Sequence, residues 1–181
     1  MAYIDQVCET ILATDKARKP HEAIWQRNVS FFKGYQWAKW HPLLGLHPSI
    51  KEQPWRVRQT FNYFRAMALT LAAKATQNSP TWAAFPASDD DDDRERSKAC
   101  TSLLDYTWMK QHCQPKLYKT TLWAVLTGQG YTGTYWNARA GDLLGRKDGK
   151  PIYTGFPQVE SISPFDIGLD PMQENVHESE W

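Results

Sequence analysis

Five consecutive aspartates, Asp89 to Asp93, come closer to metal-binding chemistry than any other run in this 181-residue chain. Carboxylates bind divalent cations when several converge on one ion. The residues that follow have helical spacing, and consecutive helical side chains point about 100° apart, so all five cannot converge. We therefore expect a solvated helix N-terminus whose acids complement the helix dipole. Asp90 and Asp92 remain weak candidate ligands for a divalent cation.

Gly128, Gly130 and Gly133 have the G-x-G-x-x-G spacing of nucleotide-binding loops. A dinucleotide loop follows a strand and opens a helix, whereas here the order is reversed. A kinase loop would require a nearby valine and a strand lysine, which the following residues lack. We interpret these glycines as a helix stop and a strand entry.

The histidines and cysteines show no zinc-ligand spacing. They are His21, His41, His47, His112 and His177, with Cys8, Cys100 and Cys113. Three cysteines are an odd number, which favours reduced thiols inside a cell over a disulfide framework. The chain contains no G-x-S-x-G motif. We predict a protein that is not an enzyme and has no cofactor.

Composition limits the remaining classes of protein. A hydrophobic content of 41% excludes a generic disordered chain, and a formal net charge of +1 is not the footprint of an autonomous DNA-binding module. No run approaches the roughly 18 apolar residues that span a bilayer. Nine tryptophans favour a core combined with subunit interfaces. A soluble, cytoplasmic protein is the starting expectation.

The first 127 residues are mainly helical in pattern. Helices are expected over 4–12, 20–34, 60–78, 88–113 and 115–127, and the first two could form one helix kinked at Pro20. Gly34 and Gly128 are the expected helix stops. Ser88 or Asp89 is the expected N-cap of the fourth helix, with Asp90–Arg94 and Asp92–Arg96 ion pairs. The core-facing stripe expected on that helix is Ala99, Leu103 and Thr107 beside Cys100, Leu104 and Trp108.

Residues 35–58 show no clear period and are expected to form a long structured loop. Its cations alternate with aromatic rings, which is compatible with nucleic-acid binding through phosphate contacts and stacking. The alternative is a loop held on the protein surface by its rings, which the near-zero net charge favours.

The chain changes to strand-like spacing after Gly128. Strands are expected over 131–138, 156–164 and 165–171, with a hairpin connection over 138–151, and a further short strand over 81–86. Residues 128–181 thus form a small antiparallel β region, and the predicted fold class is α+β. We treat 1–181 as one region and expect it to be a fragment of a longer polypeptide.

Six motifs occur in an order that resembles one protein family. They are W-x-x-N-x-x-F-F-x-G-x-Q-W from Trp25 to Trp37, R-x-x-F-N from Arg58 to Asn62, N-x-P-x-W-x-x-F-P from Asn78 to Pro86, L-L-D-Y-T-W ending at Trp108, G-x-G-x-x-G-x-Y-W from Gly128 to Trp136, and S-P-F-D-I…D-P from Ser163 to Pro171. Their order is similar to that in the N-terminal wing region of podovirus-like tailed-bacteriophage portal proteins, the head-to-tail connectors. The motif residues taken as structural are Trp25, Gly34, Trp37, Asn62, Pro80, Pro86, Trp108, Gly128, Gly130, Trp136, Asp170 and Pro171.

The resemblance implies a structural subunit of a homo-oligomeric ring, typically a dodecamer, at one capsid vertex. It implies capsid protein, large terminase subunit and tail or adaptor proteins as partners, and double-stranded DNA that passes through the channel non-specifically during packaging and ejection. The implied location is the virion, after assembly in the host cytoplasm, without a membrane. The stem and clip regions of the family are expected to be absent here.

Two alternatives come from other functional classes. One is a nucleic-acid-binding adaptor that uses the loop over 35–58. The other is a metal-dependent hydrolase built on the aspartate run.

Overall fold

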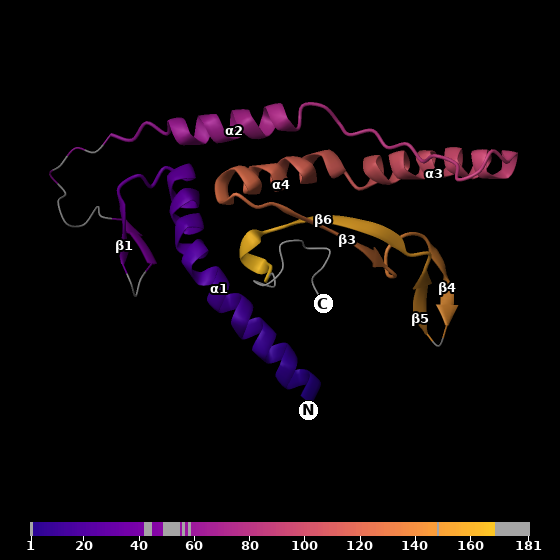
Figure 1. Ribbon diagram of the computed structural model, residues 1–181, viewed down its shortest axis with the longest axis horizontal. Coiled ribbons are helices and arrows are strands. Elements are labelled where there is room, and N and C mark those ends of the chain that lie inside the picture. Colours follow the sequence, from indigo (N-terminus) through magenta and orange to yellow (C-terminus); the bar gives the residue numbers. More distant parts are fainter. Residues whose placement is uncertain are drawn as a thin grey trace. The chain divides into compact units, whose positions relative to one another are not determined.

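The computed structural model describes residues 2–41, 45–48, 55, 57, 59–147 and 149–168 (Figure 1). In chain order the elements are α1 Ala2–Phe32, β1 Ala38–His41, β2 Gly45–Pro48, α2 Tyr63–Ala75, α3 Asp91–Lys110, α4 Cys113–Thr127, β3 Tyr131–Asn137, β4 Leu143–Lys147, β5 Lys150–Tyr153, β6 Phe156–Ile162 and a 3-10 turn, η2, at Pro164–Asp166. In these residues every strand pair is antiparallel. A helix-rich part precedes a small antiparallel β region, which confirms the predicted α+β class.

The chain forms two compact units, each assembled from separate stretches of sequence. Unit 1 comprises Met1–Ala72, Leu122–Gly130 and Ser163–Trp181, and unit 2 comprises Ala73–Thr121 and Tyr131–Ile162. Two of the boundaries between the units fall inside helices, since α2 and α4 each contribute residues to both units.

In unit 1, α1 runs without interruption through Pro20, so the single-helix alternative is correct. Proline removes one backbone hydrogen bond from a helix interior. The Arg18–Glu22 ion pair spans this position and joins the turns on either side of it. Gly34 ends the helix at φ +95, where a left-handed residue is required. Its N–H bonds Phe31 O at 3.0 Å, and the next N–H bonds Ser30 O at 2.9 Å, which is a Schellman end.

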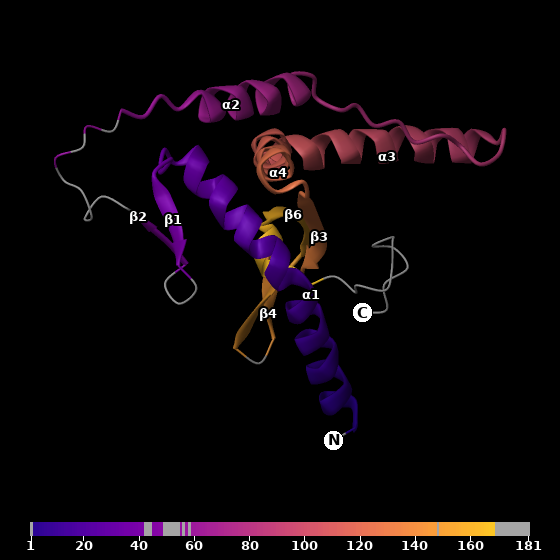
Figure 2. The same cartoon turned by 60° about the vertical axis from the view of Figure 1, so that its left-hand side comes forward.

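The expected loop over 35–58 contains a short hairpin, which corrects the sequence prediction. Ala38 pairs with Pro48 and His41 with Gly45, and β2 contacts α1 (Figure 2). Four-residue strands that include a proline give too short an alternation for a periodicity argument. Residues 42–44, 49–54, 56 and 58 lie outside the described residues.

In unit 2, α3 begins within the aspartate run at Asp91, and its N-cap is Asp90 and not the predicted Ser88 or Asp89. The Asp90 side chain makes no capping hydrogen bond, and Ser88 Oγ bonds Asp93 Oδ2 instead. The arginines also pair with aspartates other than those predicted. Arg94 pairs with Asp89 at 3.0 Å and Asp91 at 3.7 Å, and Arg96 pairs with Asp93 at 4.0 Å. The predicted i,i+4 pairs are therefore wrong, because carboxylates three and five residues away contact the guanidinium groups instead.

The predicted core-facing stripe of α3 is also wrong. No residue of α3 is buried, and Leu103 is 61% exposed. The segment before α3 contacts other residues of the helix. Thr101 Oγ1 accepts a hydrogen bond from Ala84 N at 3.0 Å, and the Trp82 and Trp108 rings lie 6.2 Å apart. Periodicity identified an apolar stripe, but the chain leaves its residues Ala99, Cys100, Leu103 and Leu104 exposed.

The segment 81–86 forms no strand, because its backbone pairs with a helix side chain and not with another strand. The later strands agree better with prediction. β3 pairs with β6 over their whole length, from Tyr131–Ile162 to Asn137–Phe156, and β4 and β5 form the predicted hairpin connection. The expected strand after β6 is replaced by η2, and its last residues, 169–171, lie outside the described part of the chain.

Helix α4 holds the β3–β6 ribbon through hydroxyl contacts. Thr120 Oγ1 donates to Ser161 Oγ at 2.9 Å and lies 3.3 Å from Thr132 Oγ1. At the other end of the ribbon, Lys110 Nζ lies 4.5 Å from the centre of the Phe156 ring and 5.2 Å from that of Tyr106. Unit 2 is thus held by contacts at both ends of β6.

Candidate functional site

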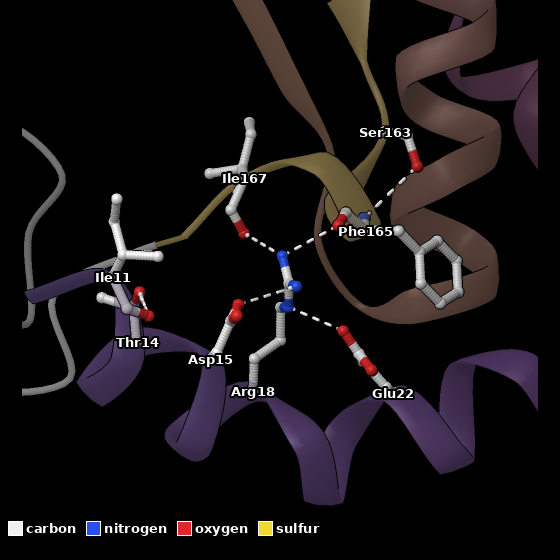
Figure 3. Close-up of polar contacts among 8 residues, drawn as sticks. All are labelled: Ile11, Thr14, Asp15, Arg18, Glu22, Ser163, Phe165 and Ile167. Carbon is white, nitrogen blue, oxygen red and sulfur yellow. Dashed lines mark hydrogen bonds and ion pairs between the residues drawn. The ribbon is translucent and has the colours of Figure 1, made fainter. Parts of the chain in front are cut away.

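Arg18 contacts four other residues of unit 1 (Figure 3). Its Nη1 donates to Phe165 O at 2.8 Å and to Ile167 O at 3.1 Å, which attaches the residues after β6 to α1. Its Nη2 donates to Asp15 Oδ1 at 3.0 Å. Its Nε lies 2.7 Å from Glu22 Oε1, although the N–H does not point along a hydrogen bond. We call Arg18, Asp15, Glu22 and the Phe165 and Ile167 carbonyls the Arg18 clamp.

Helical spacing explains why these groups meet. Asp15, Arg18 and Glu22 stand three and four residues apart, so they share one face of α1. The opposing carbonyls are presented by η2, whose first turn is capped because Ser163 Oγ accepts from Phe165 N at 3.3 Å. Gly168 passes so close to α1 that an added Cβ would lie 2.9 Å from Thr14 Oγ1. A side chain at that position would push the segment away from the clamp.

An aromatic cluster lies beside the clamp. Trp25 is only 7% exposed, and its ring meets the Phe165 ring edge-on at 5.5 Å. The Trp123 ring of α4 lies 6.1 Å from the same phenylalanine. Asn28 Nδ2 also donates to Leu126 O at 2.9 Å, which joins α1 to the last turn of α4. Large buried rings supply much of the apolar stabilisation of a small unit.

A second cluster forms where α1 ends and α2 begins, and we call it the Asn62 corner. Asn62 Oδ1 accepts from Arg65 N at 2.9 Å, which caps the first turn of α2. Its Nδ2 donates to Phe32 O at 2.9 Å, one of the carbonyls left free at the end of α1. Gln36 Nε2 donates to Phe61 O at 3.2 Å. One amide therefore bonds a backbone group at the end of α1 and another at the start of α2.

The predicted structural residues fall into three groups. Trp25, Gly34 and Asn62 make the contacts described above. In unit 2, Trp108 pairs with Trp82, and Trp136 covers Gly155 so closely that a Cβ there would lie 2.5 Å from the indole. Gly128 takes φ +83 after α4, as expected of a helix stop. Trp37 is exposed after the end of α1, and Asp170 and Pro171 lie outside the described residues.

Sequence reasoning missed Arg18 and Trp123, and it gave Phe165 only a place in the Ser163–Pro171 motif. Arg18 and Phe165 are separated by 147 positions, so no local period could relate them. The only available signal was the grouping of Asp15, Arg18 and Glu22 at helical spacing, which is typical of any solvated helix face.

The Arg18 clamp holds the residues after β6 on α1. Three of the five guanidinium N–H groups donate to carbonyl and carboxylate oxygens of the chain, and Nε lies beside the Glu22 carboxylate, so the group is largely engaged by its own chain. The candidate ligands Asp90 and Asp92 lie at the exposed start of α3. Across the described residues, no group of three or more His, Cys, Asp or Glu side chains is placed to hold a metal ion.

The thiols differ in environment, which gives a chemical test of the fold. Cys8 and Cys100 are exposed, whereas Cys113 is buried. Burial raises the pKa of the Cys113 thiol, and Lys116 only partly opposes this. Since the thiolate is the reactive form, we expect two fast thiols with Ellman's reagent and a third that reacts at least about tenfold more slowly. Chain denatured in guanidinium should show three equivalent thiols, and three fast thiols in the native chain would contradict the placement of α4.

The sign of the pH effect follows from the same shift. The folded Cys113 has a higher pKa than the unfolded thiol, so the unfolded chain loses this proton first as pH rises. Burial likewise raises the pKa of Tyr131. Both groups therefore contribute stability at neutral pH that is lost in the alkaline range.

No family model, curated protein or solved structure matches this chain. Among the described residues, no helix combines the length and apolarity needed to cross a membrane. The motifs and the contacts that they make are therefore the basis for a functional hypothesis.

Proposed function

We propose that this chain is part of a portal subunit of a tailed bacteriophage, a non-enzymatic component of the ring through which DNA is packaged and ejected. The main support is that motifs far apart in sequence are joined in the fold. The Trp25–Trp37 motif meets the Ser163–Ile167 motif through Trp25 and Phe165, and it meets Asn62 through the Phe32 carbonyl.

Unit 2 shows the same relation. The motif that ends at Pro86 meets the motif that ends at Trp108 through the Trp82–Trp108 ring pair. Motif residues that contact one another would be retained together for the sake of one fold, which favours a shared structure over chance matches. The Arg18 clamp binds chain segments to each other through three hydrogen bonds and an ion pair, which suits a structural role.

The proposed partners are further copies of the subunit, capsid protein, the large terminase subunit and tail or adaptor proteins. Double-stranded DNA would pass without sequence-specific contacts, in keeping with the near-neutral net charge. The complete gene product should form rings, typically dodecamers, that negative-stain imaging and mass photometry can detect. A strictly monomeric complete product would reject the portal function.

A nucleic-acid-binding adaptor is the second candidate, favoured by two exposed rings in the 35–58 region. Trp55 is 79% exposed and Trp37 is also exposed, and such rings can stack on unpaired bases. Fluorescence anisotropy with a labelled single strand and a labelled duplex distinguishes the two functions. Binding that weakens steeply with salt and is lost in a Trp37→Ala, Trp55→Ala variant would support the adaptor.

A further inference from the structure

The exposed stripe of α3 is an apolar surface that the chain does not cover. Ala99, Cys100, Leu103 and Leu104 are all exposed on consecutive turns, although their spacing is that of a core-facing helix. Isolated apolar residues on a surface need no explanation, but a continuous helix stripe indicates a contact with another surface.

The start of α3 gives one end of this stripe a strong negative charge. Between Asp89 and Arg96, six carboxylates and two arginines leave a net charge of −4. The side chains of Asp89 and Asp91 are fully solvated, and Arg94 is their closest cation. The patch therefore has an apolar centre and an acidic edge.

The β4–β5 hairpin has the opposite combination. Leu143, Leu144 and Ile152 are exposed, and Leu144 is 69% exposed. Arg139, Arg146 and Lys150 are exposed around them, and residues 139–150 carry a net charge of +2. This second patch has an apolar centre and a basic edge.

Both patches belong to unit 2, but they do not meet within it. Figures 1 and 2 both show the β4–β5 hairpin apart from the N-terminal end of α3. Two complementary patches at different places on one body cannot satisfy each other in the same chain. They can do so between two copies in a head-to-tail arrangement, which leaves a free patch at each end for the next copy.

We infer that the α3 stripe with its acidic start is a docking surface for the β4–β5 hairpin of a second copy of this chain. Apolar contact between the leucines would supply affinity, and the opposite charges at the edges would set orientation and oppose pairing of like patches. The inference rests on the proposed function, because the contact would join neighbouring subunits of the proposed ring.

Charge reversal with rescue tests the contact. The acidic-patch variant is Asp91→Lys with Asp92→Lys, and the basic-patch variant is Arg146→Glu with Lys150→Glu. The control is Lys19→Glu with Arg27→Glu, which applies the charge change of the basic-patch variant to exposed positions of α1. Circular dichroism checks that each variant folds, and sedimentation velocity of the whole chain measures self-association at low and high salt.

We expect salt-sensitive self-association of the unmodified chain and of the control. Each patch variant alone should associate at least about tenfold more weakly, because like charges would then face each other. An equimolar mixture should recover association, since the reversed acidic patch then meets the reversed basic patch.

Several results would overturn the inference. Patch variants that associate like the unmodified chain, a mixture that shows no recovery, or a chain that does not associate would each do so. A monomeric chain that binds duplex DNA, and that loses this binding only in the basic-patch variant, would also overturn it, since the hairpin would then contact nucleic acid.

The inference and the proposed function fail separately. Rings of the complete gene product that are insensitive to charge reversal would reject this contact and leave the portal function standing. Rescue in this chain, with no rings from the complete product, would reject the portal function and leave the contact standing.

Discussion

Trp25→Ala should lower the free energy of unfolding by about 3–5 kcal/mol, the range for removal of a large buried ring. Trp25 is the buried partner of Phe165 and also stacks near His21, with ring centres 6.4 Å apart. Its loss leaves a cavity between α1 and η2 that neither rigid element can close. Because small proteins have only about 5–15 kcal/mol of stability, the expected result is partial unfolding at ambient temperature. Urea denaturation followed by far-UV circular dichroism measures it.

Two variants make this result specific. Trp25→Phe keeps an aromatic ring against Phe165 and should lose less than half as much stability. Trp55→Ala removes the same side chain from an exposed position and should change stability by no more than about 0.5 kcal/mol. Equal losses in Trp25→Ala and Trp55→Ala would show that Trp25 is not in a core.

The predictable parts of this fold are those controlled by local chemistry. Gly34 and Gly128 both adopt the positive φ expected of residues that end helices. The change from helical to alternating spacing after Gly128 marks the entry into β3. The ability of glycine to adopt a positive φ and the spacing of apolar side chains are properties of a few neighbouring residues, so they can be recognised in a single sequence.

The unpredictable parts depend on partners elsewhere in the chain or outside it. The segment 81–86 reads as a strand, but its neighbour is α3, so Ala84 N bonds a threonine hydroxyl. The α3 stripe has the same spacing whether its own chain or another copy covers it. The Arg18 clamp joins positions that share no local sequence pattern. Its bonds to the Phe165 and Ile167 carbonyls depend on the position of η2, which no local pattern predicts.

Arg18→Ala should have the second largest effect, a loss of about 2 kcal/mol, since hydrogen bonds to charged groups contribute about 1.5–3 kcal/mol. The Arg18 side chain is only 22% exposed, so solvent replaces its bonds incompletely. The substitution leaves the Phe165 and Ile167 carbonyls without their donor and leaves Asp15 and Glu22 adjacent without a cation between them. We expect a lower melting temperature and faster chymotrypsin cleavage after Phe165.

Matched variants separate the shape of the guanidinium from its charge. Arg18→Lys keeps the charge but has one nitrogen where the guanidinium uses Nη1 for the carbonyls, Nη2 for Asp15 and Nε for Glu22, so it should fall between the native chain and Arg18→Ala. Arg27→Ala removes an exposed arginine from the same helix and should be nearly neutral. If Arg18→Lys were as stable as the native chain, charge alone would hold the segment and the two carbonyl bonds would contribute little. If cleavage after Phe165 stayed slow in Arg18→Ala, the aromatic contacts with Trp25 and Trp123 would be sufficient to hold η2 on α1.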